Sequence, residues 1–156
     1  MIPSLKAQLA DWQQTRSITL GFLEALTDAD LDKPLPRKFL NTIRLQAYEL
    51  TLFQRDIVKG LSTGNVAFEE EYIYENWPTE KIIERMAELD TALAATLATK
   101  DGTESIHYYG ETQNIHQIFS MFIGHENMHI GQIIAFCYAT GIPVPQDISE
   151  PMALEG

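Results

Sequence analysis

Four long stretches in which apolar residues recur every three or four positions constrain the fold of this chain more than any other feature. That spacing gathers the apolar side chains on one face of an α-helix. We expect helices over about residues 4–26, 41–61, 78–99 and 112–140. Pro34 and Pro36 break the chain after the first helix, and Gly141 with Pro143 ends the last. Because strand signals are nearly absent, the sequence predicts an all-α four-helix bundle.

The connections between these helices differ in length. Residues 62–77 are long enough to cross the bundle, and a short helical turn is expected there around Phe68 to Tyr72. Residues 105–108 suit a short extended piece. Residues 141–156 are expected to form a tail or strap on the surface of a single domain spanning residues 1–156.

The charge balance restricts the class of partner. The 156 residues include 11 basic and 22 acidic ones, which gives a net charge of −11. Such a field repels phosphate backbones, so neither nucleic acid nor an anionic membrane surface is an expected partner. No apolar run reaches the roughly 18 residues of a membrane span. The first residues also lack the pattern of a signal peptide, so a cytoplasmic location is expected.

The segment MFIGHENMHIGQII, residues 121–134, carries the clearest chemical signal. At about 100° per residue, His129 lies about 40° from His125 around the helix, and Gln132 lies about 20° to the other side. All three therefore fall on the apolar face, where an unpartnered polar group costs about 1–3 kcal/mol. A lone core histidine commonly hydrogen-bonds a neighbour, whereas two imidazoles one turn apart can chelate one divalent ion. We predict that His125 and His129 bind a metal.

A third ligand has to come from another segment. His116 lies on the opposite helix face and is expected at the surface, whereas His107 precedes the helix and could reach the mouth of the bundle. In the second helix, Glu49 stands at the edge of a second apolar patch. A carboxylate there is either solvated or paired with a positive group, and a metal ion would serve.

Three stretches resemble the DinB/YfiT-like family of metal-binding four-helix-bundle proteins. They are TIRLQAYELTLFQRDIVKGLSTG (residues 42–64), HENMHIGQI (residues 125–133, with the family's His-x-x-x-His-x-Gly-Gln) and ATGIPVPQ (residues 139–146). The resemblance implies a divalent ion, often zinc or nickel, held by one histidine of the second helix and two of the last.

The residues of this chain match that ligand set at two positions. His125 and His129 correspond to the last two ligands, but the second-helix position counts out to Glu49 instead of histidine. We expect Glu49 to replace the imidazole, which suits zinc and also iron(II) or nickel. Tyr48 is the alternative ligand if the register shifts by one residue.

The resemblance also implies a function. Family members with known activities are similar to thiol-dependent transferases and isomerases, in which a metal binds the thiol of a small cofactor and prepares a nucleophile. Gln132 and Glu126 would then be pocket or supporting residues around the metal. Cys137 is expected to be a small core residue, so the thiol would come from the cofactor. A homodimer is a further expectation from the resemblance.

Two other interpretations remain open. His125-Glu126-x-x-His129 is the motif of zinc peptidases, in which the glutamate is the general base, and Glu150 could supply a distant third ligand. Those enzymes hold the substrate on a sheet edge, and no sheet is predicted here. Alternatively, the histidines are a vestige, with Glu49 solvated and the bundle serving as a ligand carrier or interaction module.

Overall fold

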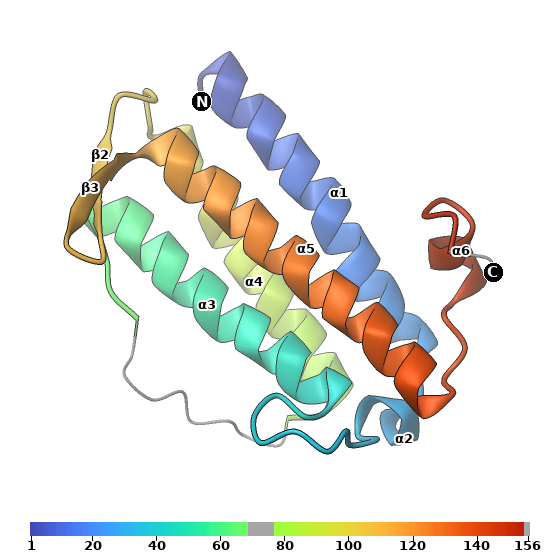
Figure 1. The fold of residues 1–156 in the computed structure, drawn as a ribbon. Helices are drawn as coiled ribbons and strands as arrows, with labels where there is room; N and C mark the ends of the chain where they lie inside the picture. Colours follow the sequence, from blue (N-terminus) through green and yellow to red (C-terminus); the bar gives the residue numbers. More distant parts are fainter. Residues whose placement is uncertain (69–76, 155–156) are drawn as a thin grey trace.

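The computed structural model describes residues 1–68 and 77–154, and four long helices lie side by side in it (Figure 1). They are α1 (Pro3–Ala25), α3 (Ile43–Thr63), α4 (Thr79–Ala98) and α5 (Ile115–Thr140). Two one-turn helices, α2 (Asp28–Leu31) and α6 (Gln146–Ser149), complete the helical elements of the described residues. The mostly helical prediction is confirmed. Most of the helical turn expected at residues 68–72 lies outside the described residues.

A small sheet, which a strictly all-α fold does not include, joins one end of the helices. Its strands are β1 (Asn65–Val66), β2 (Ser105–Tyr108) and β3 (Glu111–Asn114), with β2 in the middle. The extended piece at residues 105–108 is confirmed, but residues 112–114 of β3 were wrongly assigned to the last helix. The sequence of β3 is Glu-Thr-Gln-Asn and largely exposed, so it lacks the alternating pattern of a half-buried strand.

Side-chain caps fix where the long helices begin. The Asn114 side chain accepts a hydrogen bond from the backbone N–H of Gln117, whose side chain accepts one from Asn114 in return. This reciprocal cap starts α5 three residues later than the sequence pattern predicts. In α3 the cap is Thr42, whose hydroxyl accepts a hydrogen bond from the N–H of Leu45.

The helix α3 is buried on most of its surface, as the two apolar patches in its sequence predict. It packs against α4 on one side and α5 on the other, while α1 also contacts α4 and α5. Figure 1 shows α3 and α5 adjacent along their lengths. The core consists of two apolar clusters, one beside the sheet and one near α2 and α6. This packing holds the α3 face that carries Glu49 against α5.

The sequence analysis placed the two histidines in the middle of the buried face of α5. In the structure this face is centred elsewhere around the helix. Its buried positions run from Ile118 and Phe136 on one edge to Ile130 on the other. At about 100° per residue, their centre lies about 80° from His125 and close to Glu126. The reason is that α5 packs against both α1 and α3. His125 therefore lies at the rim of the core, with 17% of its side chain exposed.

The C-terminal segment folds back on the helices. Gly141 ends α5 with a φ of 70°, in the left-handed region that glycine adopts easily, as its position in the sequence predicts. The short helix α6 then packs on α1, where Ile148 lies beside Gly21. None of the described helices is both long and apolar enough to cross a membrane.

Candidate metal centre

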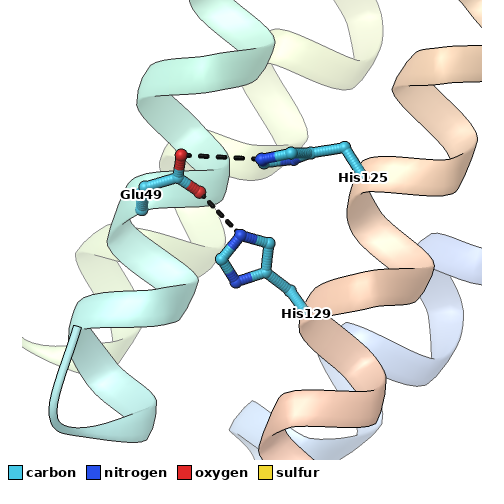
Figure 2. A group of neighbouring side chains, drawn as sticks. All are labelled: Glu49, His125 and His129. Carbon is cyan, nitrogen blue, oxygen red and sulfur yellow. Dashed lines mark ion pairs between the residues drawn. The ribbon is translucent and has the colours of Figure 1, made fainter. Parts of the chain in front are cut away.

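Three side chains from two helices converge between α3 and α5 (Figure 2). Glu49 Oε1 is 3.7 Å from Nε2 of His125, and Glu49 Oε2 is 3.0 Å from Nε2 of His129. One ligand atom of each residue lies within 4.8 Å of the others. Ligands about 2.0–2.2 Å from a zinc ion stand about 3.3 Å apart at tetrahedral angles. The spacing therefore suits three donors around one ion.

The burial of the carboxylate provides a second test of this fit. Glu49 and His129 have 10% and 2% of their side chains exposed. Although Glu49 Oε2 is buried and close to His129 Nε2, it makes no hydrogen bond within the described part of the chain. A buried carboxylate oxygen without a hydrogen bond is unfavourable. A cation bound between the carboxylate and the two imidazoles would satisfy it.

A residue that the sequence analysis did not single out orients one imidazole. The amide oxygen of Gln46, a residue with no exposed surface, lies 3.0 Å from Nδ1 of His129. With the proton on Nδ1 donated to this oxygen, Nε2 presents its lone pair toward Glu49. Gln46 stands three residues before Glu49, so both occupy one face of α3. That spacing is the sequence signal that could have identified it.

The His125 imidazole is held by packing. Its ring stacks on Phe53 with the centroids 3.6 Å apart and the planes 13° apart. Burial lowers its pKa from 6.5 to about 4; the nearby Glu49 carboxylate opposes this shift and His129 adds to it. His125 is therefore neutral at pH 7, the form in which an imidazole binds a metal.

Comparison with known proteins agrees with this geometry. The family model of the DinB superfamily matches residues 11–133, which include all three converging residues. The chain belongs to the DinB superfamily. No curated protein matches it. In this DinB-superfamily chain, Glu49 stands where the resemblance places a histidine of the second helix, and the structure directs its carboxylate at both imidazoles.

Glu126, between the two histidines in sequence, is directed elsewhere. It is fully buried, and its carboxylate accepts hydrogen bonds from Trp12 Nε1 at 3.2 Å and Thr19 Oγ1 at 2.8 Å. Arg16 Nη2 lies 3.1 Å from the same group. Glu126 thus joins α5 to α1, and its expected role as a pocket or supporting residue stays a prediction. A peptidase would need this carboxylate beside a metal-bound water, so the arrangement disfavours that interpretation.

Gln132, an expected pocket residue, and Tyr48, the alternative ligand, contact side chains outside the three converging residues. Gln132 is half-buried, and its Oε1 is 3.4 Å from Arg37 Nη1. Tyr48 is buried, and its ring centroid lies 4.8 Å from that of Trp77. Tyr48 as the ligand of a register shifted by one residue stays a prediction.

The remaining ligand candidates are placed apart from the centre. His107 is exposed on β2, with Nδ1 3.3 Å from the Thr112 hydroxyl. Glu150 is exposed after α6 and accepts a hydrogen bond from Gln146. His116 is half-buried and bonds to Gln8 of α1 at 2.7 Å. Cys137 is fully buried, as expected, and burial raises its pKa to about 11.

Proposed function

We propose that this DinB-superfamily protein binds a divalent metal ion on Glu49, His125 and His129 and activates the thiol of a small molecule for transfer to a second substrate. The observation that carries the metal proposal is the buried Glu49 Oε2, which lacks a hydrogen bond while two imidazole Nε2 atoms face the same carboxylate. A bound ion would lower the pKa of a thiol placed on it. Related hydrolase or isomerase chemistry would use the same centre.

The residues of the chain prepare this centre in three ways. Gln46 holds His129 with Nε2 directed inward, and Phe53 holds the ring of His125. The lowered pKa of His125 keeps that imidazole neutral. Three protein ligands leave room on an ion for a substrate atom. The nucleophile itself would come from outside, because the Cys137 thiol is buried and its pKa is raised to about 11.

The donor set bears on the choice of metal. Two imidazole nitrogens and one carboxylate oxygen suit zinc and nickel, and they are also the set that iron(II) sites use. A carboxylate in place of a third imidazole makes the centre more negative by one charge. We propose zinc or nickel as the resident ion, with iron(II) as the alternative that this donor set allows.

The test is the metal content of untagged protein, measured by mass spectrometry for the wild type and for Glu49→Ala. We expect close to one ion per chain in the wild type and a large loss in the variant. Glu84→Ala is the matched control, because Glu84 is exposed on α4. Equal metal in wild type and Glu49→Ala would refute the assignment of Glu49.

A non-catalytic role is the second candidate, and the 3.0 Å approach of Glu49 to His129 is the observation that favours it. In that case the group is an internal ion pair, and the bundle carries a ligand or a partner without chemistry. Protein that holds no metal as purified and takes up none on titration would establish this alternative.

A further inference from the structure

Basic residues are concentrated between the end of α2 and the first turn of α3. Residues 33–44, Lys-Pro-Leu-Pro-Arg-Lys-Phe-Leu-Asn-Thr-Ile-Arg, contain four of the chain's 11 basic residues and no acidic one. The rest of the chain therefore holds seven basic and 22 acidic residues. Figure 1 shows the segment, in cyan, running to the start of α3 at the end of the helices away from the sheet. A local excess of positive charge in such an acidic protein needs an explanation.

Two of these four cations have partners that account for them. Arg44 Nε is 2.6 Å from Asp32, and its Nη2 is 2.7 Å from Asp28, so it ties α3 to the region of α2. The ammonium of Lys33 donates to the backbone carbonyl of Thr140 at the end of α5. These contacts are structural, and they leave the charges of Arg37 and Lys38 to be explained.

Neither Arg37 nor Lys38 forms an ion pair with a carboxylate in residues 1–68 and 77–154. The Arg37 guanidinium lies 3.4 Å from the amide oxygen of Gln132 and 5.8 Å from the ring of Phe136. The ammonium of Lys38 lies over the exposed ring of Phe39 at 4.9 Å. These neutral neighbours position the two cations without cancelling their charge.

The contacts of Arg37 place its charge about one to two helical turns beyond His129 along α5. Gln132 follows His129 by three residues and Phe136 follows it by seven, which corresponds to about 5 Å and 10 Å along the helix axis. The loop is also held in shape. The Leu35 N–H donates to the carbonyl of Asn41 at 2.8 Å. The positive end of the α3 dipole, next to Thr42, adds to the potential there.

We propose that Arg37 and Lys38 bind a carboxylate on the small thiol whose sulfur occupies the metal centre. The spacing requires a carboxylate roughly 5–10 Å from the sulfur, as estimated from the helix rise. The inference rests on the proposed function. Because both cations are exposed, their contribution to the affinity for the thiol is moderate. Their main effect is to favour negatively charged thiols over neutral or positively charged ones.

The test uses the full chain loaded with cobalt(II), whose absorption changes when a thiol sulfur binds. Three thiols with the same six-carbon chain are titrated: mercaptohexanoate, mercaptohexanol and aminohexanethiol. We expect the carboxylate to bind about fivefold more tightly than the alcohol, and the amine to bind most weakly. Raising the salt concentration should reduce these differences, because exposed charges are screened.

Variants separate a local effect from a general effect of net charge. Arg37→Gln combined with Lys38→Gln should abolish the preference for the carboxylate and leave the affinity for mercaptohexanol unchanged. Arg85→Gln on α4 is the control, since Arg85 pairs with Glu88 of the same helix. Equal binding of all three thiols to the wild type would overturn the inference, and so would an equal effect of the control.

The outcomes also distinguish this inference from the proposed function. If cobalt(II) does not bind to the wild type, or if no thiol changes its absorption, the thiol-activating metal centre is refuted and the inference fails with it. If cobalt(II) and thiols bind without discrimination by charge, the proposed function survives and only the role of Arg37 and Lys38 is refuted.

Discussion

The substitution Glu126→Gln tests whether the glutamate of the His-Glu-x-x-His motif is structural or catalytic. The change preserves the shape of the side chain and removes its negative charge. The structure surrounds this carboxylate with Trp12, Thr19 and Arg16, all on α1. A structural role predicts that the variant loses stability while its metal affinity stays within about twofold, because the ligand atoms are untouched.

The size of the effect follows from the burial of both charges. Glu126 is fully buried and Arg16 is 2% exposed, and removal of one partner of such a pair costs about 3–5 kcal/mol. Two features reduce the loss. Asp90 remains 3.6 Å from Arg16 Nε, and the new amide oxygen can accept one of the two hydrogen bonds. We therefore expect a fall of about 3 kcal/mol in the free energy of unfolding.

The assay is urea unfolding of the metal-free protein, together with a metal titration of the folded variant. Glu84→Gln, at an exposed position of α4, should change the free energy of unfolding by less than about 0.5 kcal/mol. Replacing the pair with apolar residues, Arg16→Met with Glu126→Leu, should restore part of the stability. A loss below about 1 kcal/mol for Glu126→Gln, or a large loss of metal affinity, would refute this reasoning.

Three further predictions concern single groups. Gln46→Leu removes the acceptor for the Nδ1 proton of His129 and should weaken metal binding about 10- to 100-fold in a competition titration, whereas Gln46→Glu should retain most of it. The pKa of His125 is about 4 in the folded state and 6.5 when unfolded, so the unfolded chain takes up the proton first. The free energy of unfolding of the metal-free protein should therefore fall between pH 6.5 and pH 4, and His125→Gln should remove that contribution. Cys137, with a pKa of about 11, should react slowly with a thiol reagent at neutral pH in the native protein and quickly in urea.

Local sequence signals account for much of the fold. Apolar periodicity and end signals such as Gly141 placed the four long helices, because both depend on residues close together in the chain. The start of α5 was placed too early, since Thr112 and its neighbours are polar and pair with β2 through main-chain hydrogen bonds. A strand that is held by its backbone leaves little pattern in its side chains.

The candidate site also has features that the sequence predicted and features that it did not. The four-residue spacing of His125 and His129 fixes by itself that the two imidazoles share one helix face. The resemblance to the family pointed to Glu49 by its position in the second helix. It did not show which groups the Glu49 carboxylate contacts. The sequence pattern also centred the buried face of α5 on the histidines, whereas the packed helix is rotated toward Glu126.

The sequence by itself determined which residues share a helix face, because the helical repeat is a local property of the backbone. The tertiary structure decided the rest. It brought Glu49 of α3 to the two imidazoles, directed Glu126 into the contact with α1, and placed Gln46 behind His129. The physical reason is that the rotation of α5 about its axis depends on two neighbouring helices at once. The sequence of α5 alone does not predict which parts of its surface contact α1 and which contact α3.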